Sequence, residues 1–182
     1  MRDKLELALD AGRKTGALTL EYFGRHADVR DKGNGHPVST ADLEADLLLK
    51  EILLGACPDY GWLSEETADD ARRLHKETVW IVDPIDGTRE FLQRIPEYVV
   101  SIALVRQGEP VVGVIFNPAR DELYAAVRGG GAFLNGKRVF CSATTRLDQA
   151  TLIVSRSEAG RGEVDPFPVS YTHLTLPTKR IV

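Results

Sequence analysis

The sequence has few of the residues that mark several common classes of protein. Only two of its 182 residues are cysteines, Cys57 and Cys141, and this pair forms neither a metal-binding nor a redox motif. Lysine and arginine number 23 against 27 aspartates and glutamates, which gives a formal net charge of -4. No excess of positive charge is therefore available to bind a nucleic acid polymer or an anionic membrane surface.

Long apolar segments are also lacking. The first residues include the acidic Asp3 and Glu6, and the longest apolar strings are no longer than a strand. We therefore expect neither a secretory signal peptide nor an integral membrane segment. Because both cysteines are expected to remain reduced thiols, the sequence predicts a cytoplasmic protein.

Hydrophobic residues nevertheless make up 43% of the chain, enough to bury a core. Apolar residues recur with helical spacing from about Asp3 to Phe23, and Gly12 and Gly16 on that face favour close packing against another helix. A second helix is predicted to begin at Ser39–Asp42 with a capping box and to end before Pro58. Its expected apolar face consists of Leu43, Leu47, Leu48, Ile52 and Leu53.

After the second helix the hydrophobic period becomes that of strands. Short apolar runs alternate with turn residues, and Asn135-Gly136 between two of them is a hairpin signal. The runs are Tyr60–Leu63, Val79–Val82, Tyr98–Val105, Val111–Phe116, Leu123–Val127, Phe133–Leu134 and Val139–Phe140. Two helices followed by an antiparallel meander predict a layered α+β fold. Thr151–Ser155 is one further predicted strand, and the last residues show no clear period.

The most informative string is Asp83-Pro84-Ile85-Asp86-Gly87-Thr88. We expect Pro84 to end the preceding strand, so that both aspartates converge on one side of the turn. Gly87 permits a backbone angle that other residues avoid, and the amides of Gly87 and Thr88 would then form an anion-binding nest. Oxygen ligands beside a phosphate-sized nest suit Mg²⁺. The alternative is a turn in which the aspartates only cap backbone amides.

Two other acidic features have structural explanations of their own. Glu65 and Glu66 follow an apolar strand, and adjacent carboxylates repel each other unless a cation or solvent relieves them. The alternative for this pair is a solvated loop. Asp42 is the acidic member of the capping box opened by Ser39, and that capping would also fix its orientation.

Three strings together resemble the motifs of the inositol-monophosphatase superfamily in order and spacing. They are Pro37-Val38-Ser39-Thr40-Ala41-Asp42, Ser64-Glu65-Glu66 and Asp83-Pro84-Ile85-Asp86-Gly87-Thr88. The resemblance implies an α+β fold, a layered α/β sandwich of the sugar-phosphatase type. It also implies a Mg²⁺-dependent phosphomonoesterase that acts on a small phosphorylated metabolite, and it allows a homodimer.

The resemblance implies roles for single residues as well. One Mg²⁺ would lower the pKa of an attacking water and a second would stabilise the leaving oxygen, without a covalent phosphoenzyme. The implied metal ligands are Glu65, Asp83, Asp86 and the carbonyl of Ile85. The implied catalytic residues are Asp42, Glu65 and Thr88. The implied substrate-binding residues are Glu65, Ile85, Asp86, Gly87 and Thr88. Lys32 matches a loop lysine that approaches the site in the family.

Two local departures bear on the substrate. Ser64 replaces the glycine usual before the two glutamates, and Arg89-Glu90-Phe91 stands where a Thr-Asn-Phe type triplet is common. This combination resembles the bacterial 3′(2′),5′-bisphosphate nucleotidases, which convert 3′-phosphoadenosine 5′-phosphate to AMP and phosphate. We favour that substrate here; inositol 1-phosphate or a related sugar phosphate is the alternative.

The family completes its second metal site with an aspartate in a Trp-Asp-x-Ala-Ala-Gly type motif, which this sequence does not contain. We therefore expect a metal-binding α+β domain over residues 1–148, the start of a C-terminally truncated α/β domain over 149–168 and a non-native tail over 169–182. Such a chain should bind Mg²⁺ weakly and should itself be nearly inactive. The alternative of another class is an inactive fragment that binds metal or phosphate without turnover.

Overall fold

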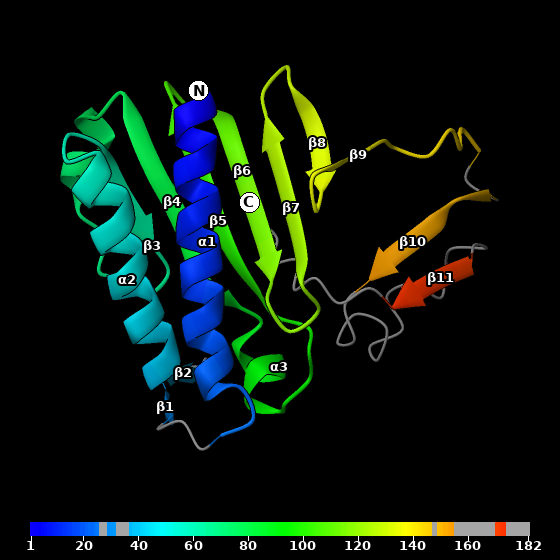
Figure 1. The fold of residues 1–182 in the computed structure, drawn as a ribbon, viewed down its shortest axis with the longest axis horizontal. Helices are drawn as coiled ribbons and strands as arrows, with labels where there is room; N and C mark the ends of the chain where they lie inside the picture. Colours follow the sequence, from blue (N-terminus) through cyan, green and yellow to red (C-terminus); the bar gives the residue numbers. More distant parts are fainter. Residues whose placement is uncertain (26–28, 32–36, 147–148, 155–169, 174–182) are drawn as a thin grey trace. The chain divides into compact units, whose positions relative to one another are not determined.

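The computed structural model describes residues 1–25, 29–31, 37–146, 149–154 and 170–173 (Figure 1). The chain divides into two compact units, Met1–Val139 and Phe140–Val182. Within the described ranges, no helix combines the length and the apolar character needed to cross a membrane. Lys32 lies outside these ranges, so its predicted approach to the site has no structural description.

Two long helices run in opposite directions over one face of a sheet (Figure 1). Helix α1 (Arg2–Tyr22) contacts helix α2 (Thr40–Ala56) and also three strands of the sheet. The buried side of α1 consists of small residues, Ala8, Ala11, Gly12, Thr15, Gly16 and Thr19. The prediction that the glycines pack against another helix is wrong. A Cβ on Gly16 would lie 2.6 Å from Cδ1 of Phe116, which belongs to the sheet.

The buried face of α2 also differs from the predicted one. Leu43 and Leu47 are 40% and 65% exposed. Of the predicted residues, Leu53 is buried and Ile52 packs against the core; the other buried positions are Ala41, Asp42, Ala45, Asp46 and Leu49. Small side chains let the helix approach its neighbours closely, so the contact face includes Ala41 and Ala45 beside Leu49 and Leu53. This face carries two buried carboxylates, which matter for the site.

The sheet of the first unit has seven strands in chain order, β3-β4-β5-β6-β7-β8-β9. Their bounds are Gly61–Ser64, Thr78–Asp86, Val99–Arg106, Glu109–Asn117, Glu122–Val127, Gly131–Leu134 and Lys137–Val139. Strands β4 to β9 form the predicted antiparallel meander, and β8 and β9 flank the predicted turn at Asn135-Gly136. Strand β3 is parallel to β4, so the sheet is mixed. The predicted α+β class is confirmed.

Two apolar clusters hold this unit together. The larger one lies between the helices and the sheet and includes the fully buried Trp80, Leu49 and Leu53. The smaller one joins Ala41, Ile85, Phe91 and Tyr98, with the rings of Phe91 and Tyr98 edge to face at a centroid distance of 4.9 Å. The smaller cluster fixes the short helix α3 (Thr88–Leu92) and so positions the turn that precedes it.

Two short sheets complete the described structure. Strand β1 (Val29–Asp31) is antiparallel to β2 (Pro37–Ser39), directly before α2. In the second unit, β10 (Thr151–Val154) is parallel to β11 (Ser170–His173). The strand predicted at Thr151–Ser155 is therefore present. The segment 169–182, in which the sequence showed no period, contains β11.

Candidate functional site

The strand that carries the two motif aspartates does not end where the sequence predicted. Strand β4 continues through Pro84 to Asp86. Asp83 is paired with Ser101 and Asp86 with Val99, so one extra residue of β4 is inserted as a bulge. A bulge tolerates proline because the extra residue leaves the hydrogen-bond ladder. Asp83 therefore lies inside the strand, and Asp86 ends it.

Gly87 and Thr88 form the joint between β4 and α3. Gly87 has φ 101° and ψ 37°, the left-handed region, which confirms the expected unusual backbone angle. Helix α3 begins at Thr88, and the amide of Phe91 donates to the carbonyl of Gly87 over 2.9 Å. The first amides of a helix have no partner within it, so this joint presents N–H donors directly beside Asp86.

Asp42 connects the start of α2 to the start of α3. Its Oδ2 accepts from the backbone amide of Ser39 at 2.7 Å and from the Ser39 hydroxyl at 2.5 Å. Its Oδ1 lies 3.1 Å from Oγ1 of Thr88, which is also 3.1 Å from the carbonyl oxygen of Ile85. The predicted capping box is present. The two interpretations of Asp42, as a cap and as the partner of Thr88, are thus compatible in one geometry.

Glu65 and Asp83 lie at the same edge of the sheet. Strands β3 and β4 are parallel, and the pair Ser64–Val82 is the last in their register. Glu65, directly after β3, and Asp83, within β4, each follow that pair by one residue, so the two residues lie at the same level along the sheet. Oδ1 of Asp83, Oδ1 of Asp86 and Oε2 of Glu66 are shielded from solvent, whereas Glu65 is exposed.

Asp46 is a buried site residue that the sequence reasoning missed. It is 4% exposed and accepts hydrogen bonds from two hydroxyls. Oδ1 accepts from Oγ of Ser64 at 2.5 Å, and Oδ2 accepts from Oγ1 of Thr67. The signal was its position four residues after Asp42, which places both carboxylates on one helix face.

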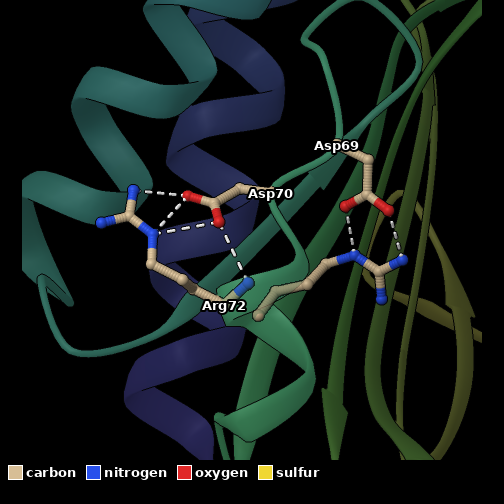
Figure 2. Close-up of polar contacts among 4 residues, drawn as sticks. Asp69, Asp70 and Arg72 are labelled. Carbon is tan, nitrogen blue, oxygen red and sulfur yellow. Dashed lines mark hydrogen bonds and ion pairs between the residues drawn. The ribbon is translucent and has the colours of Figure 1, made fainter.

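Beyond Thr67 the loop is held by ion pairs (Figure 2). Asp70 accepts from the amide of Arg72 at 3.0 Å and caps the 3-10 helix η1 (Ala71–His75). The hydrogen bond from the Arg72 side chain lowers the pKa of Asp70 to about 2. Asp69 receives two hydrogen bonds from Arg73, at 2.6 and 2.8 Å, and these lower its pKa. Both pairs join residues within 69–73, so they connect η1 to the two residues directly before it.

The donors at this edge fit a hard divalent cation in their chemistry. Glu65, Asp83, Asp86 and the Ile85 carbonyl offer only oxygen, which is what Mg²⁺ takes. Within the part of the chain that the structure describes, no group of three or more His, Cys, Asp or Glu side chains is arranged to hold a metal ion. Like charges repel, so these carboxylates gain from a closer approach only when a cation lies between them.

Comparisons with known proteins agree on one family. Residues 1–167 match the Inositol monophosphatase family. The chain is 41% identical over 172 residues to the inositol-1-monophosphatase of Rhizobium meliloti, covering 93% of this chain and 64% of that protein. It is 42% identical over 159 residues to the histidinol-phosphatase of Chlorobaculum parvum, covering 87% and 61%. The chain thus spans less than two thirds of the length of these relatives.

Solved structures agree. The extragenic suppressor protein suhB from Bartonella henselae superposes with a TM-score of 0.82 at 33% identity, covering 93% of this chain and 69% of that one. The Thermotoga maritima IMPase superposes with a TM-score of 0.83 at 28% identity, covering 95% and 68%. The motifs, the fold and the match over residues 1–167 have one explanation: the chain belongs to the inositol monophosphatase family.

Proposed function

We propose that this chain carries the metal-binding half of the active site of a Mg²⁺-dependent phosphomonoesterase for small phosphorylated metabolites. The observation that carries the proposal is the contact between Thr88 and the buried Asp42. This contact lies beside the Ile85 carbonyl and Asp86 at the end of β4. The relatives named above are phosphatases by name, which supports the same reaction class.

Asp42 and Thr88 are suited to hold a water molecule. The Thr88 hydroxyl directs its single proton toward Asp42 Oδ1 and the Ile85 carbonyl. Its oxygen lone pairs then remain available to accept a hydrogen bond from water. Because Asp42 is fixed by Ser39, the direction of that hydrogen bond is set by the fold. The pair therefore orients a water molecule: as Oγ1 takes a proton from the water, the hydroxyl proton of Thr88 passes to Oδ1 of Asp42.

The neighbouring groups bind the metal and the phosphate. Glu65, Asp83, Asp86 and the Ile85 carbonyl would hold Mg²⁺. When bound, Mg²⁺ supplies positive charge next to the phosphate and lowers the pKa of water. The amides at the Gly87–Thr88 joint donate to phosphate oxygens, which would otherwise be repelled by the carboxylates.

Two substrates have specific support. The resemblance to inositol-1-monophosphatases of several bacteria favours inositol 1-phosphate. The Arg89-Glu90-Phe91 triplet favours 3′-phosphoadenosine 5′-phosphate, because Arg89 is exposed in the first turn of α3 and a guanidinium suits a second phosphate. Ser64 supports the nucleotide less, since its hydroxyl already has an internal partner in Asp46. We place inositol 1-phosphate first and the nucleotide second.

A phosphate-release assay tests the reaction class. A version of the chain extended to the length of its relatives is incubated with each ester in the presence of Mg²⁺, and again after addition of a chelator. We expect release that stops with the chelator and returns when Mg²⁺ is restored. Thr88→Ala, which removes the hydroxyl beside Asp42, is the matched inactive variant. Release that survives the chelator, or equal release by the variant, would count against the proposal.

A further inference from the structure

We propose that Asp46 is a positioning residue for metal binding: its carboxylate holds both sides of the Glu65-Glu66 pair and so sets where Glu65 stands. The inference rests on the proposed function, because it assigns Glu65 to the metal. It concerns a residue that touches neither metal nor substrate in that proposal and that acts only through the loop after β3.

The contacts of Asp46 bracket the acidic pair. On one side, Ser64 donates to Oδ1 of Asp46, and the same Ser64 oxygen accepts from the backbone amide of Glu66 at 3.2 Å. On the other side, Thr67 donates to Oδ2. One carboxylate therefore fixes the residue before the pair, the residue after it and the peptide of Glu66 within it.

A carboxylate is the group that this arrangement needs. Both hydroxyls act as donors, and an ionised carboxylate accepts at both oxygens without offering a proton of its own. The side chain is supplied by α2, whose buried alanines on the same face bring the helix close to β3 and β4. Asp46 is 4% exposed and Ser64 is 7% exposed, so water competes little for these hydrogen bonds.

The outer part of the connection is anchored separately. Asp69 and Arg73 join the loop to η1, and η1 packs against β3, where a Cβ on Gly61 would lie 3.0 Å from Cβ of Arg73. The exposed Glu65 side chain thus belongs to a segment whose backbone is held on both sides. Loss of the Asp46 contacts would release Ser64 and Thr67, while η1 stays packed on β3. Glu65 could then move relative to Asp83.

Binding of Mn²⁺, an oxygen-ligated substitute for Mg²⁺, tests the inference directly. The free Mn²⁺ signal in electron paramagnetic resonance is followed during titration of the wild-type chain, Asp46→Asn, Ser64→Ala and Thr67→Val. Groups that hold metal ligands in place typically contribute about 10- to 100-fold to affinity. We expect Asp46→Asn to weaken binding about tenfold or more and each hydroxyl variant to weaken it less. Glu51→Gln, an exposed carboxylate on the same helix, is the charge-matched control and should bind as the wild type does.

Two further readouts separate positioning from general loss of structure. Thr67→Ser keeps the hydroxyl and should restore wild-type affinity, whereas Thr67→Val should not. Because Ser64 acts through Asp46, the double variant Asp46→Asn/Ser64→Ala should bind Mn²⁺ little more weakly than Asp46→Asn alone. In phosphate release, the Mg²⁺ concentration for half-maximal activity should rise in Asp46→Asn, while kcat at saturating Mg²⁺ changes much less.

The possible outcomes distinguish this inference from the proposed function. Unchanged Mn²⁺ affinity in Asp46→Asn and in Thr67→Val, with a wild-type chain that binds Mn²⁺, overturns the role of Asp46 and leaves the phosphatase proposal standing. Mn²⁺ binding that depends on Asp46, without any phosphate release from the version extended to the length of the relatives, contradicts the phosphatase proposal alone. A wild-type chain that binds no Mn²⁺ overturns both. If Asp46→Asn does not fold, the Mn²⁺ affinities of Ser64→Ala and Thr67→Val decide whether Asp46 has this role.

Discussion

The Thr88 hydroxyl lies 3.1 Å from Oδ1 of Asp42, although the two residues are 46 positions apart in the chain. The contact joins the first turns of α2 and α3. Asp42 is held by Ser39 on one side, and α3 is held by the burial of Phe91 on the other. A hydroxyl and a carboxylate are thus brought together by two separate helix starts, beside Asp86 at the end of β4.

Substitution at this contact should affect turnover much more than binding. We expect Thr88→Ala and Asp42→Asn each to lower kcat by about 10²-fold, the range of a lost proton-accepting group, with a smaller change in KM. Steady-state phosphate release measures both. Asparagine caps a helix as well as aspartate does, so an unchanged kcat in Asp42→Asn would mean that Asp42 only caps α2.

Arg89 should distinguish the two candidate substrates. If 3′-phosphoadenosine 5′-phosphate is the substrate, Arg89→Ala removes a partner of its second phosphate and should lower kcat/KM for it about tenfold or more. The value for inositol 1-phosphate should change less than about twofold by the same reasoning, since it has no second phosphate. Arg89→Lys keeps the charge and serves as the control. Equal losses for both esters would contradict the nucleotide assignment.

Gly16 should tolerate no side chain. The Cβ of Gly16→Ala would lie 2.6 Å from Cδ1 of Phe116 and 3.1 Å from Cβ of Pro118. Overpacking of this kind lowers the free energy of unfolding by about 1–3 kcal/mol. Gly55→Ala is the control: it lies near the end of α2, a Cβ there meets nothing within 4 Å, and alanine favours a helix by up to about 1 kcal/mol. Chemical denaturation compares the two, and an equally stable Gly16→Ala would contradict the packing.

Tyr98 should make stability depend on alkaline pH. Burial raises the pKa of Tyr98 from 10.0 to about 12. Its hydroxyl lies 3.4 Å from Oγ1 of Thr19, which donates its own proton to the Gly16 carbonyl, so Tyr98 is the donor. The folded chain holds the phenol proton more tightly than the unfolded chain. The stability from the neutral phenol is therefore complete below pH 10 and is lost as the pH rises through about 12.

Urea unfolding at pH values from about 9 to 12 measures how the free energy of unfolding changes with pH. This pH range spans the interval between the unfolded and the folded pKa of Tyr98. Tyr98→Phe has no proton to lose at this position, so its slope should be shallower than that of the wild type. Tyr124→Phe removes an exposed phenol and should keep the wild-type slope. Identical slopes in all three proteins would show that Tyr98 does not contribute.

Much of the local structure can be predicted from the sequence alone. The first helix was expected from about Asp3 to Phe23 and runs from Arg2 to Tyr22. The capping box at Ser39, the left-handed Gly87 and the turn at Asn135-Gly136 were expected from their residue types and are present. Each of these features depends on a few neighbouring residues, because backbone angles and helical periodicity are local properties of the chain.

The tertiary structure decided what the local patterns left open. Leucine spacing on α2 favoured Leu47 as a core residue, yet Ala45 and Asp46 are buried, since the close approach of other elements requires small side chains there. Strand β4 continues past Pro84 because its partner β5 accommodates a bulge. Asp46 gains its two hydroxyl donors only when α2 packs beside the loop after β3. The sequence by itself determined the helices, the turns and the motif residues; which carboxylates are buried, and what they hold, depends on contacts between segments far apart in the chain.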